Sequence, residues 1–333
     1  MKVFITNING HASTSTAHLA QEMVAGIGAR QGFQEIGLYP YPVWTDTPEE
    51  LNKRLDGVLA GLGHEDVVIV QTPSWIEYPY EENLIEKITH YSDTRLVIFI
   101  HDCPPLMFEE SGPNMPHTIA SYNKADVLIA PSQAMIDELR KHGLTVEKTL
   151  VQKLWDHPTE VPQKPATFKK EIHFPGNIDR FGFLNDWQSP IKLHLYDYKE
   201  QDAYPETIIK HPFYCDEELL LEMSKGGFGL VWTVGWEREH YVPYYCSYKL
   251  STYIAAGIPV IVPRGISNQD LIEEKGLGLV VDTIEEATAK IEAMTADEYM
   301  AMVARVRQFS RLVRNGWFTK RLLNEAVFQA LMP

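Results

Sequence analysis

Short apolar runs alternate with amphipathic stretches throughout the first half of the chain. The apolar runs are rich in Val and Ile, are bounded by turn residues, and show almost no polar alternation, which is typical of strands covered on both faces. We therefore expect strands at Val3–Ile8, Ile36–Tyr39, Val67–Gln71, Leu96–His101 and Val127–Ala130.

The stretches between these runs carry helix signals. Thr47-Pro48-Glu49-Glu50 has the form of a capping box with proline at the first helical position. Ser132 is placed to cap a second helix, which Gly143 ends. Alternating strands and helices predict βαβ units, and hence an α/β fold with a parallel sheet.

The alternating pattern of apolar and amphipathic stretches ends near Asp156. The stretch from Asp156 to Lys170 holds three prolines and has no apolar period, which indicates an interdomain linker. The alternation then resumes, with strands expected at Glu171–Phe174, Lys192–Tyr196, Phe228–Thr233, Pro259–Pro263 and Gly278–Val281. Helices are expected at Asp216–Ser224 (with Asp216 as cap), Ser247–Ala256, Asn268–Glu274, Ile284–Met294 and, with a break at 314–316, Asp297–Leu331.

Chain length indicates the number of domains, and net charge excludes some classes of binding partner. The 333 residues correspond to roughly two domains. We place these at residues 1–157 and 171–315, with a linker at 158–170 and a terminal helix at 316–333. The formal net charge of −15 argues against nucleic acid or an anionic membrane as a non-specific partner, but leaves room for a small anionic ligand.

Three cysteines without a CxxC motif indicate a reducing compartment and no zinc site. No apolar run approaches ~18 residues, so neither a signal peptide nor a membrane span is expected. A cytoplasmic location follows as an expectation.

Ligands of doubly wound α/β domains bind at the carboxyl ends of the strands, so candidate residues are sought there. Gly10 ends the first strand, and a hydroxyl cluster that includes Thr14 and Thr16 leads into a helix, an arrangement suited to an oxygen-rich ligand. The alternative is an ordinary turn with a helix cap. No GxGxxG dinucleotide fingerprint follows this strand.

His101 and Asp102 end the fourth strand as an acid–base pair, and either is a candidate to deprotonate a hydroxyl nucleophile. They are equally compatible with a strand-end histidine and a turn aspartate. His11, Glu109 and Glu110 are weaker candidates for the same task.

The second half holds the most specific motif. Arg180 follows Gly176 and Asn177, after the first strand of that half. Lys249 lies in the first turn of a helix that opens near Ser247, where an anion would offset its unfavourable position. A helix N-terminus with Lys249 and Arg180 predicts a diphosphate site; the alternative is an ordinary helix–turn–strand unit.

The segment Ser-Tyr-Lys-Leu-x-x-Tyr-x-Ala-Ala-Gly-x-Pro-Val-Ile, from Ser247 onward, resembles the donor-binding segment of GT-B glycosyltransferases. The wider chain resembles one subfamily, the glucosyltransferase that acts second in glycosylation of bacterial serine-rich-repeat adhesins. The stretches that carry this resemblance are Ile5–Gly10, Lys53–Gly57, Phe99–Asp102, Trp155–Thr159, Glu171–Asn177, Gly226–Trp232 and Cys246–Leu250.

The resemblance implies a GT-B fold of two Rossmann-like domains facing a cleft, with the terminal helix crossing back to the first domain. It implies glucose transfer, or in some relatives N-acetylglucosamine (GlcNAc) transfer, from a UDP-sugar to GlcNAc already attached to Ser or Thr of the adhesin. It also implies a cytoplasmic homotetramer that needs neither a metal nor another cofactor.

Roles for individual residues come from the same resemblance. Arg180 and Lys249 would grip the diphosphate, and Tyr214 would lie near the uracil or ribose. Asn177, Ser247 and Tyr248 would help to close the donor pocket. Gly10 and residues 14–16, Thr16 among them, would approach the sugar or the acceptor.

Two features qualify this picture. Many GT-B enzymes hold the ribose with a Glu three residues after the Lys, where this chain has Thr252, so the ribose contact is weaker or comes from elsewhere. The loop 235–245, which includes Pro243 and Tyr244, is expected either to wall the sugar end of the donor pocket or to form an oligomer contact.

Three other functions stay open at this point. They are a GT-B nucleotide-sugar epimerase, a non-catalytic glycopeptide-binding partner of another transferase, and a Rossmann dehydrogenase, the last disfavoured by the missing fingerprint. The donor sugar, the stereochemistry and the base are undecided.

Overall fold

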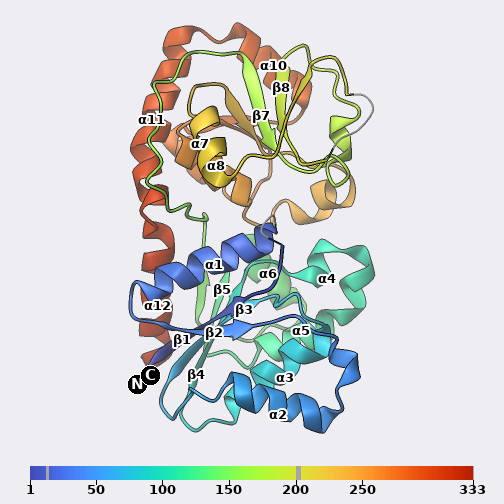
Figure 1. Ribbon diagram of the computed structural model, residues 1–333, viewed down its shortest axis with the longest axis vertical. Coiled ribbons are helices and arrows are strands. Elements are labelled where there is room, and N and C mark those ends of the chain that lie inside the picture. Colours follow the sequence, from blue (N-terminus) through green and yellow to red (C-terminus); the bar gives the residue numbers. More distant parts are fainter. Residues whose placement is uncertain (13–14, 200–203, 333) are drawn as a thin grey trace. The chain divides into compact units, whose positions relative to one another are not determined.

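A computed structural model describes residues 1–12, 15–199 and 204–332. The chain divides into two compact units (Figure 1). Unit 1 contains residues 1–153, 243–246 and 318–333, and unit 2 contains residues 154–242 and 247–317. The whole of the predicted linker, residues 158–170, therefore packs as part of unit 2.

Unit 1 is built on a six-stranded parallel sheet of order β2-β1-β3-β4-β5-β6. Its strands are β1 (Val3–Ile8), β2 (Gln34–Leu38), β3 (Val67–Thr72), β4 (Arg95–Ile100), β5 (Val127–Ala130) and β6 (Thr149–Val151). Every residue of β3 and β5 is buried, as expected of strands covered on both faces.

Helices cover this sheet on both faces, with α1 on one side and α2 and α3 on the other (Figure 1). Their bounds are α1 (Thr16–Ala29), α2 (Pro48–Val58), α3 (Tyr78–Thr89), α4 (Pro104–Met107), α5 (Met115–Tyr122) and α6 (Gln133–Lys141). Short 3₁₀ turns lie at Val43–Thr45 and Glu109–Asn114.

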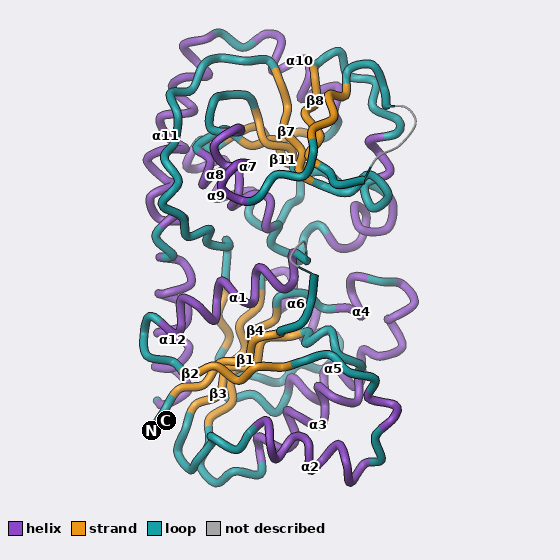
Figure 2. Tube along the Cα trace, in the orientation of Figure 1, coloured by secondary structure: helices purple, strands orange, loops and turns teal. Residues whose placement is uncertain are grey.

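Unit 2 repeats the plan, with a six-stranded parallel sheet of order β12-β11-β10-β7-β8-β9. Its strands are β7 (Glu171–Pro175), β8 (Lys192–Tyr196), β9 (Ile208–His211), β10 (Phe228–Leu230), β11 (Val260–Pro263) and β12 (Gly278–Val281). In Figure 2 the strands of each unit lie at its centre, with helices and loops around them.

The helices of unit 2 are α7 (Asp216–Met223), α8 (Tyr248–Ala256), α9 (Gln269–Lys275), α10 (Ile284–Ala293) and α11 (Ala296–Arg314). A 3₁₀ turn lies at Gly182–Leu184 and a π-helical turn at Glu237–Tyr241. The terminal helix α12 (Trp317–Leu331) belongs to unit 1 from Phe318 onward, where Lys148 Nζ donates to Gln329 O over 3.1 Å.

The predicted signals are seen at several helix ends. Thr47 and Glu50 form the capping box of α2, and Ser132 Oγ accepts from Met135 N at the start of α6. The predicted cap of α7 is wrong by one residue. Cys215 is the extended N-cap residue, Glu218 accepts from Cys215 N over 3.2 Å, and Asp216 is already helical.

Two strands, β6 and β9, have no counterpart in the prediction. Both lie at the open edge of their sheet, where β6 is only partly buried and β9 ends on Lys210 and His211. Edge strands need no continuous apolar run because one side is not covered by a neighbouring strand, so the apolar pattern does not reveal them.

Candidate active site

Helix α8 presents its first turn at the carboxyl edge of the second sheet and is fixed firmly behind it. Its residues from Leu250 to Ala256 are all buried, and Gly257 ends it with a φ of 82°. Tyr253 Oη donates to Leu230 O over 2.8 Å. The Tyr253 ring lies so close to β10 that a Cβ on Gly229 would stand 2.1 Å from it. The first turn of α8 is thereby held in place.

Lys249 lies in that first turn, half-buried against two aromatic rings. Its Nζ is 4.3 Å from the ring centroid of Phe181 and 5.3 Å from that of Phe174. Burial lowers the pKa of Lys249 to about 7, with a smaller contribution from the positive charge of Arg180. The negative charge of Glu237 has the opposite effect and raises this pKa. A bound anion would favour the ammonium form, because a nearby opposite charge raises the pKa of a lysine.

Arg180 comes from the turn after β7. Its backbone N–H donates to Asn177 O over 3.2 Å, and its guanidinium lies 5.3 Å from the Phe181 ring centroid. The side chain is exposed. Within the described part of the chain, neither Arg180 nor Lys249 forms an ion pair with a carboxylate. Two cations without a carboxylate, beside a helix N-terminus, form a site suited to a diphosphate.

The turn between β7 and Arg180 is tightly specified. A Cβ on Gly176 would stand 2.5 Å from the Phe174 ring, so only glycine fits. Asn177 Oδ1 accepts from Asp179 N over 2.8 Å, and Asn177 Nδ2 donates to the Tyr198 hydroxyl over 3.1 Å. Asn177 is therefore positioned on the same turn as Arg180.

Ser247 and Tyr248 begin α8. Ser247 is the N-cap residue and is buried, but its side chain makes no capping hydrogen bond. The Tyr248 ring packs 6.5 Å from Trp155 and 5.7 Å from His157. His157 Nε2 in turn lies 2.9 Å from Asp216 Oδ2. The 155–157 segment thus supports the first turn of α8.

Thr252 is 6% exposed, and its side chain contacts other residues of unit 2. Its hydroxyl donates to Tyr248 O over 3.2 Å and lies 3.4 Å from His157 Nδ1. A hydroxyl engaged in this way is a poor replacement for the ribose-binding Glu of other GT-B enzymes.

Tyr214, the residue expected near the base, follows β9. It is half-buried, with its ring 5.5 Å from Tyr196 and 6.1 Å from His211.

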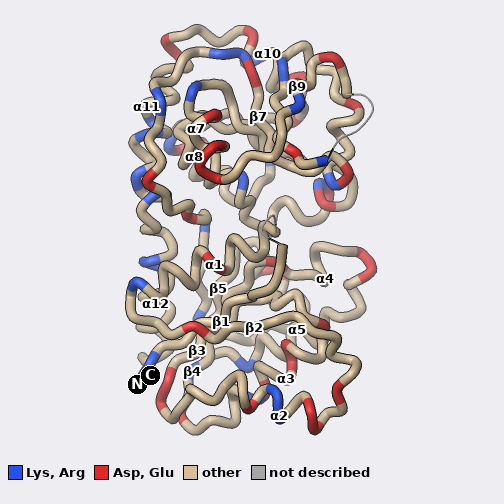
Figure 3. The backbone as a smooth tube through the Cα atoms, in the orientation of Figure 1, with Lys and Arg blue, Asp and Glu red and all other residues tan. Residues whose placement is uncertain are grey.

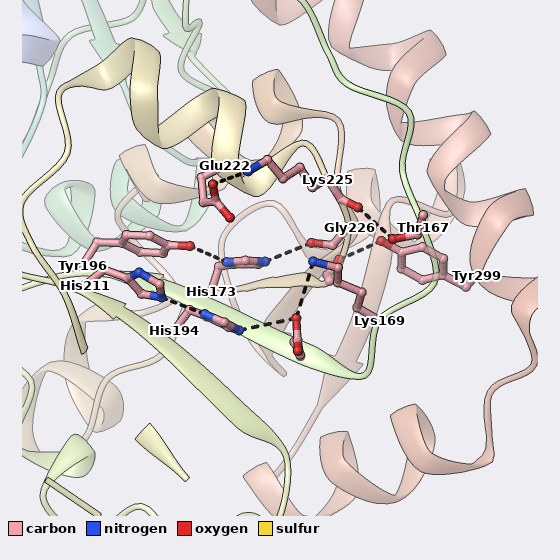
Figure 4. Close-up of polar contacts among 12 residues, drawn as sticks. Thr167, Lys169, His173, His194, Tyr196, His211, Glu222, Lys225, Gly226 and Tyr299 are labelled. Carbon is pink, nitrogen blue, oxygen red and sulfur yellow. Dashed lines mark hydrogen bonds and ion pairs between the residues drawn. The ribbon is translucent and has the colours of Figure 1, made fainter. Parts of the chain in front are cut away.

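Behind Tyr214 lies a polar cluster that the sequence did not reveal, made by His173, His194, His211 and Tyr196 on three neighbouring strands (Figure 4). His173 Nε2 is 2.9 Å from Gly226 O, and its Nδ1 is 2.8 Å from the Tyr196 hydroxyl. Since a carbonyl only accepts, neutral His173 donates from Nε2 and accepts at Nδ1 from Tyr196.

His194 and His211 form the second part of the cluster (Figure 4). His194 Nδ1 is 2.8 Å from His211 Nε2, and His194 Nε2 is 3.4 Å from Glu171 Oε2. Burial lowers the pKa of all three histidines, that of His173 to about 3. Alternate residues on neighbouring strands signal such a cluster only once the strand register is known.

The predicted residues of unit 1 fall at the ends of its strands. Gly10 is exposed with a φ of 75°, and Thr16 is the exposed first residue of α1. Thr14 lies outside the described residues. His11 stacks on His18, and burial lowers its pKa. Glu109 and Glu110 are exposed at the start of a 3₁₀ turn.

His101 is buried after β4, where burial lowers its pKa to about 3. A histidine with this pKa is a weak general base at neutral pH. Asp102 is half-buried and is the better candidate of the pair.

Glu81 is a candidate that sequence reasoning missed. It lies in the first turn of α3, accepts from Ser74 N over 2.5 Å, and has its pKa raised to about 7 by burial. A carboxyl that titrates near neutral pH is suited to proton transfer. The only signal in the sequence is a Glu soon after Pro79.

Pro243 and Tyr244 belong to unit 1. Their carbonyls accept from Ser132 Oγ over 3.2 and 2.8 Å, and the Tyr244 hydroxyl donates to Glu138 over 3.3 Å. These contacts tie the segment to α6. Its role beside a sugar stays a prediction.

Over the described residues, no group of three or more His, Cys, Asp or Glu side chains is arranged to hold a metal ion. None of the helices in the described part of the chain has the length and apolarity needed to cross a membrane.

Comparison with known proteins decides the family. The N-terminal domain of the glucosyltransferase 3-like family matches residues 2–154, and the C-terminal domain of that family matches residues 172–326. The chain belongs to the glucosyltransferase 3-like family.

Members of this family from Streptococcus are similar over their full length. Glucosyltransferase 3 of Streptococcus parasanguinis is 51% identical over 99% of both chains. Glucosyltransferase 3 of Streptococcus gordonii is 43% identical over 99% of this chain and 100% of that protein.

Solved structures show the same fold at low identity. Trehalose-6-phosphate synthase OtsA matches with a TM-score of 0.67 at 10% identity, over 98% of this chain and 99% of that one. Anabaena HepE, solved in complex with UDP-glucose, matches with a TM-score of 0.65 at 13% identity, over 98% and 99%. These structures confirm the expected GT-B fold. The family match and the two Streptococcus relatives make the chain a glycosyltransferase.

Proposed function

We propose that this glucosyltransferase 3-like protein transfers glucose, or alternatively GlcNAc, from a UDP-sugar to GlcNAc already O-linked to Ser or Thr of a serine-rich-repeat adhesin. Support for the donor comes from the cationic site on α8 and from a GT-B neighbour that holds UDP-glucose. Support for the acceptor comes from the resemblance to the adhesin-glycosylating subfamily.

The single observation that carries the proposal is the pair Lys249 and Arg180, two cations that share the Phe181 ring at the first turn of α8. When the bond between sugar and diphosphate breaks, negative charge develops on the leaving phosphate. Preorganised cations stabilise that charge most in the transition state. We propose that they do so without a metal ion.

The acceptor hydroxyl needs a base only if the reaction inverts the anomeric centre. Asp102 and Glu81 are the candidates in unit 1, since the low pKa of His101 weakens its claim. If the reaction retains configuration, substitution of these carboxylates should leave the chemical step largely intact.

A panel of UDP-sugars with a GlcNAc-bearing Ser/Thr peptide tests the proposal directly. The reaction is run in EDTA, because the proposed mechanism needs no metal ion. The mass of the product peptide is then measured by mass spectrometry. We expect the peptide to gain one hexose or one N-acetylhexosamine. The same peptide without GlcNAc is the matched control and should gain nothing.

Each contrary outcome of this assay would exclude a different part of the proposal. Transfer to the unmodified peptide would contradict the acceptor, and activity restored only by a divalent cation would contradict the metal-free proposal. Conversion of the donor without any acceptor would favour a nucleotide-sugar epimerase, and binding of the glycopeptide without UDP binding would favour a non-catalytic partner.

We further propose a cytoplasmic homotetramer, supported by the same resemblance. Size-exclusion chromatography with light scattering measures the molecular mass of the assembly. A monomer at micromolar concentration would contradict the proposed tetramer.

A further inference from the structure

A second polar pocket lies on helix α11 in unit 2. It has a volume of about 370 Å³. Its wall includes three arginines and three amides, namely Arg307, Arg311, Arg314, Gln163, Gln308 and Asn315. The arginines stand at i, i+4 and i+7, so they share one face of the helix. Figure 3 shows Lys and Arg recurring along α11.

The pocket is positive although the chain is acidic. No Asp or Glu lines it, and in the part of the chain that the structure describes none forms an ion pair with these arginines. Glu160 attracts Arg314 only from beyond ion-pair distance. Three guanidinium groups without a carboxylate are unusual in a protein with a net charge of −15, and they favour an anionic ligand.

Backbone carbonyls hold two of these arginines in place. Arg314 Nη1 donates to Ala255 O over 2.9 Å, and its Nη2 donates to Val161 O. Arg307 Nη2 donates to Lys164 O over 2.5 Å and to Ser224 O over 3.2 Å. Carbonyls fix a guanidinium without neutralising it, so a ligand would meet preorganised charges and lose less entropy on binding.

Donors are left over after these contacts. Arg311 is exposed, so its guanidinium is accessible to a ligand. Arg307 Nε also lacks an acceptor, but this atom is buried and does not face the pocket. Each guanidinium carries five N–H donors, more than the carbonyls take up. Planar guanidinium forks match the oxygens of a phosphate, and the Gln308 amide suits a hydroxyl group. The other two amides are engaged within the protein, since Gln163 Nε2 donates to Ala255 O and Ser310 Oγ and Asn315 Nδ2 donates to Arg311 O.

We propose that this pocket binds a small phosphate ester with a hydroxyl-bearing remainder. The volume exceeds what a phosphate ion alone would fill, and the Gln308 amide lies beside the arginines. The pocket is separate from the donor site. It meets α8 at Ala255, six residues and roughly 9 Å along the helix from Lys249.

Calorimetry with glycerol 3-phosphate tests the proposal in the full chain carrying Lys249→Ala, which removes the candidate diphosphate site as a source of heat. We expect one molecule to bind per chain, and glycerol to give no signal. Adding Arg311→Ala should weaken binding at least tenfold. Because Arg311 is exposed and holds no carbonyl, this variant should fold normally. Arg321→Ala, an exposed arginine on α12, is the matched control and should bind as the parent does.

No binding of glycerol 3-phosphate at millimolar concentration would overturn the proposal. Binding that survives Arg311→Ala, or that falls equally in Arg321→Ala, would also overturn it. The measurement uses no donor and no transfer, so its result is independent of the proposed reaction.

Discussion

At the scale of single residues, the chemistry of this protein rests on how Lys249 is placed. Its ammonium is half-buried, lies on Phe181 and faces the charge of Arg180, and these surroundings lower its pKa to about 7. Such a lysine is partly neutral in the empty protein and becomes charged when an anion arrives. Donor binding and proton binding are therefore coupled.

Lys249→Met tests this coupling. In the unchanged protein at pH 8, UDP should bind with proton uptake, because the anion raises a lysine pKa that starts near 7. The variant should lose that uptake, bind UDP at least tenfold more weakly and transfer sugar ~10²-fold more slowly. Calorimetry in two buffers of different ionisation heat measures the uptake.

Lys275→Met, at the exposed end of α9, is the control and should behave as the parent. Proton uptake that persists in Lys249→Met would assign it to another group.

At the scale of elements, the close approach of α8 to β10 fixes the site. Gly229 lies in β10 against the Tyr253 ring, and Tyr253 donates to the backbone of the same strand. Interiors this dense transmit small changes in volume into shifts of whole elements. The position of Lys249 therefore depends on Gly229, a buried residue of another element.

Gly229→Ala should both destabilise unit 2 and weaken UDP binding. Its Cβ would stand 2.1 Å from the Tyr253 ring, which forces α8 outward. Overpacking of this kind costs about 1–3 kcal/mol. Denaturant unfolding and UDP calorimetry measure the two effects.

Gly57→Ala provides the opposite case, since a Cβ there meets nothing within 4 Å in the last turn of α2. It should stabilise unit 1 by about 0.4–1 kcal/mol and leave UDP binding unchanged. Equal stability of Gly229→Ala and the parent would show that β10 and α8 are less tightly packed than described.

At the scale of the whole molecule, buried histidines should make stability depend on acidity in both units, through His101 in unit 1 and His173 in unit 2. His173 is buried and neutral there, with a pKa lowered to about 3, and burial also lowers the pKa of His194 and His211. Below about pH 6.5 these histidines bind protons in the unfolded chain but stay neutral in the folded protein. The stabilisation is complete above that pH and is lost as the pH falls toward 3.

Hydrogen exchange at β7 and β8 between pH 7 and pH 4.5 measures this loss. His173 alone should contribute about 1.4 kcal/mol per pH unit below 6.5. Replacing it by Phe removes two hydrogen bonds and lowers stability at pH 7, but the slope against pH should become shallower by about one proton. An unchanged slope in His173→Phe would assign the acid sensitivity to other groups.

The sequence by itself determined the two parallel α/β units, most of the strands and the motif at α8, because apolar runs, capping residues and glycines act over a few neighbouring positions. It also singled out Arg180 and Lys249 as the pair of cations. It did not reveal the edge strands β6 and β9, the histidine cluster or the raised pKa of Glu81.

Only the tertiary structure decided those features. Whether His173 meets Tyr196 depends on strand register, and whether Glu81 or His101 holds a proton depends on how deeply it is buried. The same is true of Thr252, whose hydroxyl the fold directs toward Tyr248 and His157. Burial and register arise from contacts between residues distant in the chain, so no local pattern encodes them.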